Sequence, residues 1–279
     1  MKRFLLPYLL FFLSAEIHGQ IAHDTAGCRF FQPFAGYKSW TSPAKGTFYL
    51  TWGYNKDAYT KTDVRVHSSD EKVDFTLYDM TARDHAQWKD ILRVQPSIPQ
   101  YDYRLGYWLP NGKFGIEANF DHAKYIVNDW QHVHMNGNIY GEHFDTDTTV
   151  DPDHFLHLEH TDGANLLMLN LMFRAPLFAS THAHLFWIAK AGAGVVIPRS
   201  DVTLWGLRWN HCFHIAGPTT GIETGFRLEF YKYFFFEPTI KGAYCDFKNV
   251  LARDNILISH QFFAGMGILC AGFQVPLGK

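Results

Sequence analysis

Histidine and carboxylate side chains are concentrated in one stretch of the chain, residues 121–162. This stretch holds seven of the 16 histidines. Imidazole and carboxylate groups together are ligands for transition metals, and the same groups act as general acids and bases. The composition therefore leaves open a metal site, a hydrolytic site or a polar surface loop. The residues concerned are His122, His132, His134, His143, His154, His157, His160, Asp121, Asp129, Glu142, Asp145, Asp147, Asp151, Asp153, Glu159 and Asp162.

Each alternative would use a different part of this stretch. A metal site would be built from His154, His157 and His160, and a divalent metal is the one cofactor that the composition suggests. A surface loop would need no converging groups, and its positive charge would rise as the pH falls below about 6.5. For a hydrolytic site, the candidate catalytic residues are Asp121, His122, His160 and Asp162.

Charged residues also alternate with apolar residues along segments that have the period of β-strands. If such strands closed into a membrane barrel, the apolar face would meet lipid and the charged face would line the lumen. In a narrow lumen the charges would either pair with one another or form a polar site reached from one end. The candidate binding residues are Asp102, Arg104, Glu117 and Asn119 on the wall, with Lys124 and Glu159 beyond it; the same pattern continues at Asp63, Arg65, Asp74, Asp121, Glu223, Arg227, Glu229, Glu237 and Lys241.

Residues 100–127 are predicted to form the hairpin that positions most of these candidates. Asn111-Gly112 favours a tight type I′ turn, because both central residues of that turn need positive φ. The alternation fails after Asp121, so that a regular strand would turn Lys124 toward lipid. Either a bulge turns Lys124 inward beside Asp121, or this segment marks the boundary of the membrane.

Strand-like segments recur along the chain, and about ten can be counted. Short and long connections between them alternate strictly, as in outer-membrane barrels with tight periplasmic turns and long outer loops. We therefore expect an all-β, antiparallel transmembrane β-barrel of about ten strands, with an irregular outer loop over residues 128–163. The short connections are 69–71, 110–112, 175–180 and 232, and the long ones are 55–61, 81–99, 128–163, 197–219 and 248–257.

The start of the chain has the pattern of an export signal. Two basic residues precede an apolar run of about ten residues, which is too short to cross a bilayer. We predict a signal peptide over residues 1–20, a periplasmic segment over 21–45 and the barrel over 46–279. The formal charge of −2 argues against a nucleic-acid partner, and the four cysteines match no zinc spacing.

Five short motifs resemble a family of bacterial outer-membrane β-barrel proteins of uncharacterised function. The resemblance covers most of the chain between residues 52 and 165. It implies a barrel in the bacterial outer membrane, and it brings no established activity. The motifs are Trp52-Gly53-Tyr54-Asn55-Lys56, Asp74-Phe75-Thr76-Leu77-Tyr78, Ala82-Arg83-Asp84, Asp121-His122-Ala123-Lys124-Tyr125 and Glu159-His160-Thr161-Asp162-Gly163-Ala164-Asn165.

Three functions remain open at this point. The first is a non-enzymatic surface or porin-like barrel of the outer membrane, whose narrow polar lumen or loops bind or pass a small polar ligand. The second is an outer-membrane hydrolase that acts on lipid or peptide. The third is a secreted soluble β-sandwich or a lipocalin-like carrier, since aromatic residues at 17% suit a carbohydrate-binding sandwich as well as a membrane girdle. The expected partners of the barrel are outer-membrane lipid and lipopolysaccharide.

Overall fold

The computed structural model describes most of the chain from residue 45 onward. The predicted signal peptide and nearly all of the predicted periplasmic segment lie outside the described residues. No helix in the described part is long and apolar enough to cross a membrane. The described residues are 45–68, 70, 72–85, 100–110, 112–160, 162–180, 182–253 and 255–278.

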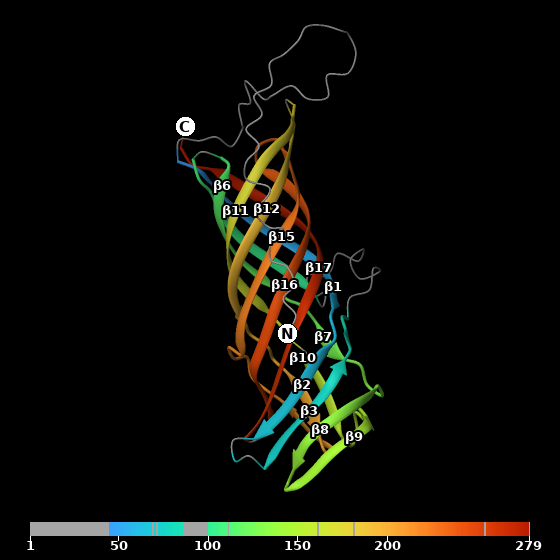
Figure 1. Ribbon diagram of the computed structural model, residues 1–279. Coiled ribbons are helices and arrows are strands. Elements are labelled where there is room, and N and C mark those ends of the chain that lie inside the picture. The colour runs from blue at the N-terminus through green and yellow to red at the C-terminus, as the bar shows by residue number, and fades with distance from the viewer. Residues whose placement is uncertain are drawn as a thin grey trace, which may run out of the picture. The chain divides into compact units, whose positions relative to one another are not determined.

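Eight antiparallel strands of the described chain form a closed ring (Figure 1). The ring closes where the first strand pairs with the last, from Thr47 opposite Pro276 to Tyr59 opposite Ala264. The predicted antiparallel β-barrel is therefore confirmed. The ring strands are β1 (Thr47–Tyr59), β5 (Tyr101–Trp108), β6 (Phe114–Asp121), β11 (Leu166–Ala179), β12 (Ala183–Val196), β15 (Gly217–Phe230), β16 (Phe234–Arg253) and β17 (Ile256–Pro276).

The ring contains fewer strands than the ten expected, because two of the predicted strands lie outside it. β2 (Thr62–Ser68) pairs with Ile256–His260, a part of β17 that lies beyond its pairing with β1. β3 (Val73–Met80) pairs with β2, and the sheet continues through β8 (His132–Ile139) to β9 (Glu142–Thr149). The stretch expected to be an irregular outer loop is therefore largely strand.

A second sheet lies beyond the ring and consists, in the described residues, of five short strands. Its order is β14 (Leu207–Asn210), β13 (Asp201–Leu204), β10 (Leu156–His160), β7 (Tyr125–Val127) and β4 (Ala82–Arg83). Apolar residues of this sheet, such as Leu158 and Val202, share one buried core with Val66 and Phe75 of the first sheet. We call β2–β4, β7–β10, β13 and β14 the head.

The connections between ring strands differ at the two ends of the barrel. Short turns join β5 to β6, β11 to β12 and β15 to β16, and we call this the turn end. The other connections carry the strands of the head at the loop end, except for the direct hairpin between β16 and β17. Gly112 has a φ of +67° and donates a hydrogen bond to the carbonyl oxygen of Leu109, as a tight turn requires. Asn111 lies outside the described residues.

The outer wall of the ring is covered with exposed apolar side chains. Leu171 is 73% exposed and Ile222 is 69% exposed, and both lie midway along their strands. Alternation along each strand causes this pattern, since every second residue faces outward. Such a band is typical of a wall that contacts lipid. It includes Phe48, Leu50, Leu105, Ile116, Leu169, Phe226, Phe234, Phe236, Ile240, Phe263, Leu269 and Phe273.

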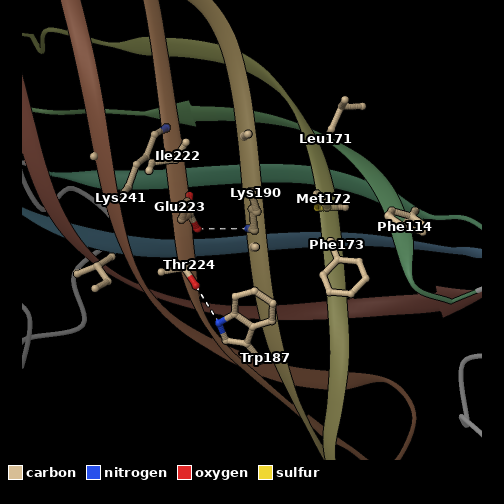
Figure 2. A pocket seen from close by; sticks show the side chains of 14 residues that line it. Phe114, Leu171, Met172, Phe173, Trp187, Lys190, Ile222, Glu223, Thr224 and Lys241 are labelled. Atoms are coloured by element: carbon tan, nitrogen blue, oxygen red, sulfur yellow. Dashed lines mark hydrogen bonds and ion pairs between the residues drawn. The ribbon is translucent and has the colours of Figure 1, made fainter. Parts of the chain in front are cut away.

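A groove of about 840 Å³ runs along this wall over β11, β12, β15 and β16 (Figure 2). Small residues such as Ala189 and Gly242 line it together with larger apolar residues such as Leu171. The indole nitrogen of Trp187 donates a hydrogen bond of 2.9 Å to the hydroxyl of Thr224, so this polar group is satisfied within the wall.

Candidate functional site

The charged residues of the ring strands meet inside the barrel in one network. The guanidinium of Arg104 lies 2.7 Å from both carboxylate oxygens of Glu223 and 3.4 Å from a carboxylate oxygen of Asp121. Asp121 also accepts a hydrogen bond of 2.5 Å from the ammonium of Lys241. The ammonium of Lys190 lies 2.9 Å from Glu117 and reaches the carboxylate of Glu223 at 3.3 Å (Figure 2).

The network continues toward the turn end. Glu237 accepts hydrogen bonds from Lys190 at 2.5 Å and from Arg227 at 2.8 Å. Arg227 also lies 3.1 Å from Glu229, whose carboxylate in turn pairs with Arg174 at 2.7 Å. Each cation thus contacts at least one carboxylate, which offsets the cost of removing these charges from water.

These side chains fill the lumen. Arg104 is 1% exposed, and Asp121 and Arg227 are not exposed at all. Asn119 donates to Asp121 at 2.7 Å, and one carboxylate oxygen of Asp102 accepts from Asn55 at 2.9 Å. The structure therefore brings the candidates Asp102, Arg104, Glu117, Asn119 and Asp121 together, but in a packed interior where each of them is at most 2% exposed.

His122 marks the end of the lumen network. Its Nδ1 lies 2.7 Å from the side-chain oxygen of Asn165, and its ring stacks on Tyr101 with the ring centres 4.4 Å apart. Burial lowers the pKa of His122 to about 4, so the imidazole is neutral near pH 7. These contacts suit a residue that anchors the loop more than one that exchanges protons.

Of the two alternatives that the sequence pattern left open for Lys124, the structure excludes a bulge that turns it inward beside Asp121. β6 ends at Asp121, and Lys124 lies in the link to β7 of the head. Its ammonium is partly buried, which lowers its pKa, while Glu159 and Asp162 act in the opposite direction. The ammonium makes no hydrogen bond or ion pair with any described residue, which distinguishes it from the cations of the lumen.

Two carboxylates act on this lysine, and a cation from a third segment pairs with one of them. β10 pairs with β7 so that Glu159 lies opposite Ile126, two residues along from Lys124 and on the same face of the sheet. Asp162 follows β10 and forms an ion pair with Arg199. Arg199 is held in place by a hydrogen bond of 3.0 Å from its Nε to the carbonyl oxygen of His211. We call Lys124, His157, Glu159, Asp162 and Arg199 the mouth cluster.

His157 is the remaining member of the mouth cluster. Its Nε2 lies 3.8 Å from Glu159, and its Nδ1 lies 2.8 Å from a carboxylate oxygen of Asp129. The carboxylates of Glu159 and Asp129 together raise the pKa of His157 to about 9, against the opposite effect of desolvation. His157 therefore carries a positive charge at neutral pH.

The titration of His157 can be followed directly. We expect its imidazole signals to move with a pKa of about 9 in NMR spectra, and Asp129→Asn should shift that pKa toward the ordinary value near 6.5. Because the folded-state pKa is the higher one, the stabilisation is complete below about pH 6.5 and is lost as the pH rises through about 9. If the pKa of His157 were the same in the Asp129→Asn variant as in the unmodified protein, this assignment would be contradicted.

His160 points to the other face of β10, into the core between the two sheets. Its Nδ1 lies 2.8 Å from the hydroxyl of Ser200, and its Nε2 lies 3.2 Å from Nε2 of His260. A hydroxyl beside an imidazole could act as a nucleophile and its base. However, His160 and Ser200 are both 0% exposed, with the ring of Phe247 stacked on His160, so a substrate has no access.

The three candidate metal ligands do not converge. His154 is exposed and pairs with Asp151 at 3.0 Å, His157 belongs to the mouth cluster, and His160 is buried in the core. Over the described ranges, no group of three or more His, Cys, Asp or Glu side chains is placed to hold a metal ion.

No pattern in the sequence identifies several residues of these sites as neighbours of the candidates. Arg199 and Ser200 come from the connection after β12, and no spacing links them to residues 121–162. Asn165 could be found only as part of the family-like motif, without a role. Lys190 is different, because strand alternation places it on the inward face of its segment.

Comparisons with known proteins show that this chain is similar to others in architecture alone. No family model and no curated protein matches the chain, so the resemblance to an uncharacterised family stays an expectation. Several solved bacterial outer-membrane barrels are structurally similar. OprG from Pseudomonas aeruginosa is 9% identical, with a TM-score of 0.37, over 84% of this chain and 98% of that one.

Two further barrels show a similar likeness. The attachment invasion locus protein Ail of Yersinia pestis is 11% identical, with a TM-score of 0.30, over 83% of this chain and 99% of that one. Neisserial surface protein A is 10% identical, with a TM-score of 0.30, over 84% and 100%. The assignment of this chain as a barrel rests on its own strand pairing.

Proposed function

We propose that this chain is a non-enzymatic surface barrel of the bacterial outer membrane that binds a small polar ligand at the mouth cluster. The single observation that carries this proposal is the packed lumen. Arg104 and Arg227 are buried in ion pairs, so the inside of the barrel offers neither a path for solutes nor an accessible site. Ligand recognition is therefore assigned to the loop end. The apolar outer band supports contact with membrane lipid and lipopolysaccharide.

The chemistry of the mouth cluster indicates the class of ligand. Lys124 supplies an ammonium without a protein partner in the described chain, and an organic anion could form an ion pair with it. The partly exposed carboxylates of Glu159 and Asp162 can accept hydrogen bonds from hydroxyl groups. Strand pairing holds Glu159 in place, so little ordering would be needed on binding. A sugar acid carries both kinds of group.

Binding to a sugar acid provides the test. We expect the protein in detergent micelles to bind galacturonate and to bind galactose more weakly, because galactose lacks the carboxylate. Lys124→Met should weaken galacturonate binding by about tenfold, the size expected for loss of a charge-assisted hydrogen bond. Isothermal titration or chemical-shift changes at His157 would measure this. Lys72→Met, which removes an exposed lysine of the head, serves as the control. If Lys124→Met bound galacturonate as tightly as the unmodified protein does, the proposed site would be refuted.

The packed lumen leads to a separate expectation. In planar lipid bilayers the purified protein should give no stepwise conductance, because buried, ion-paired side chains fill the lumen. A pore-forming outer-membrane barrel measured in the same bilayers is the positive control. Regular conductance steps from the pure protein would favour the porin-like alternative over a closed barrel.

The other two functions have less support. A hydrolase would need its catalytic groups within reach of a substrate, and the hydroxyl–imidazole pair of Ser200 and His160 is enclosed in the core. A secreted sandwich or lipocalin-like carrier would turn its apolar faces inward, whereas here Leu171 and Ile222 face outward around the ring.

A further inference from the structure

β9 is a long strand at the free edge of a sheet. In the described part of the chain its only strand partner is β8, with which it pairs in register from Glu142 opposite Ile139 to Thr149 opposite His132. It is eight residues long and most of its residues are exposed. The edges of the second sheet are much shorter, at four residues for β14 and two for β4.

The hydrogen-bond pattern of the hairpin shows which backbone groups face the free edge. Tyr140 and Gly141 have φ values of 52° and 92°, as in a two-residue type I′ turn, which makes Ile139 and Glu142 a hydrogen-bonded pair. Val150 continues the same alternation, because its N–H donates a hydrogen bond to the carbonyl oxygen of Gln131. The backbone N–H and C=O groups that point away from β8 therefore belong to His143, Asp145, Asp147 and Thr149.

β9 lacks three of the features that can blunt an edge strand. It has no proline and no lysine, and its pairing with β8 contains no bulge. It is acidic instead, with Glu142, Asp145 and Asp147 exposed. A second copy of β9 would bring like charges opposite one another, which disfavours self-pairing.

Asp145 and Asp147 retain capacity for a cation. His134 on β8 contacts one oxygen of each, at 2.9 Å from Asp145 and 3.1 Å from Asp147. The second oxygen of each carboxylate has no hydrogen bond to any described residue. The two side chains lie on one face of the strand, two residues apart, so cations at alternate positions of an added strand would lie beside them.

From these observations we infer that β9 is a docking edge for a basic, extended segment of a partner polypeptide. The partner segment adds a strand next to β9 through backbone hydrogen bonds, with lysine or arginine at alternate positions facing Asp145 and Asp147. Residues between the basic positions face Phe144 and Thr146 and are small or apolar. This surface is separate from the mouth cluster and does not rest on the function proposed for it.

The test uses the full protein in detergent micelles and a capped peptide, Lys-Val-Lys-Thr-Lys-Val-Lys, followed by fluorescence anisotropy. We expect saturable binding. The same peptide with N-methyl groups on alternate backbone nitrogens keeps its charge, and it should bind about tenfold more weakly or less because edge hydrogen bonds are lost. Equal binding of both peptides, or no binding of either, would overturn the proposal.

Two variants separate the backbone contribution from the charge contribution. Asp145→Pro removes an N–H that faces the free edge and leaves the pairing with β8 intact, so the fold should persist while binding falls about tenfold. Asp145→Asn with Asp147→Asn keeps the edge and should remove the salt dependence of binding. Unchanged binding by the proline variant would refute strand addition. Dimers of the protein that the peptide cannot dissociate would assign the edge to a second copy instead.

Discussion

Arg104→Met is expected to destabilise the barrel by about 3–5 kcal/mol, because it removes one of the cations that balance the buried carboxylates of the lumen. Arg104 lies 2.7 Å from Glu223 and 3.4 Å from Asp121, and all three residues are buried, with no more than 5% of any of them exposed. Urea unfolding in phospholipid vesicles, followed by tryptophan fluorescence and by gel mobility of unheated samples, would measure the loss of free energy of unfolding.

The same measurement has a matched control in the head. Arg65 forms an equally short pair with Asp74, at 2.7 Å, but both side chains are about half exposed to water. Arg65→Met should therefore cost less than about 1 kcal/mol. Adding Glu223→Gln to Arg104→Met should recover part of the loss, since the second substitution removes one buried negative charge and restores the balance of charge in the lumen. Equal effects of Arg104→Met and Arg65→Met would show that the lumen is hydrated.

Ile222→Arg is expected to destabilise the protein in a bilayer by about 2–4 kcal/mol. Ile222 lies at the middle of β15 and is flanked by Ala191 on β12 and Gly242 on β16. Neither neighbour offers a partner for a guanidinium, and lipid offers none either. The free energy of unfolding in vesicles would give the size of the effect.

The control for this prediction is an exposed apolar residue of the head. Leu207 on β14 is 47% exposed, and Leu207→Arg should change the stability by no more than about 0.5 kcal/mol. If both variants were tolerated equally, the apolar band of the ring would not be a membrane surface. The pair of variants therefore tests the placement in the membrane without depending on any ligand.

Much of the ring could be predicted from local patterns. The hairpin expected over residues 100–127 appears as β5 and β6, and alternation placed Asp102, Arg104 and Glu117 on the inward face. This works because the period of two is a property of the strand itself. The end of the alternation after Asp121 also has a structural meaning, since β6 ends there.

The number of ring strands could not be predicted in the same way. β2 and β3 have the same alternation as the ring strands, but β2 pairs with the far end of β17 and β3 pairs with β2, both outside the ring. A strand pattern identifies the faces of a strand and not its neighbours. The strands β8 and β9 were missed because their exposed face is polar and their segment is rich in His and Asp, which hides the alternation.

By itself, the sequence determined an all-β chain whose strands have one apolar and one charged face. Only the tertiary structure decided which charges meet. Arg104 and Glu223 are 119 residues apart and come into contact because the ring closes in one particular register. The residues of 121–162 separate for a related reason, since neighbours on β10 such as Glu159 and His160 point to opposite faces. One face of β10 contributes to the partly exposed mouth cluster, and the other contributes to a closed core.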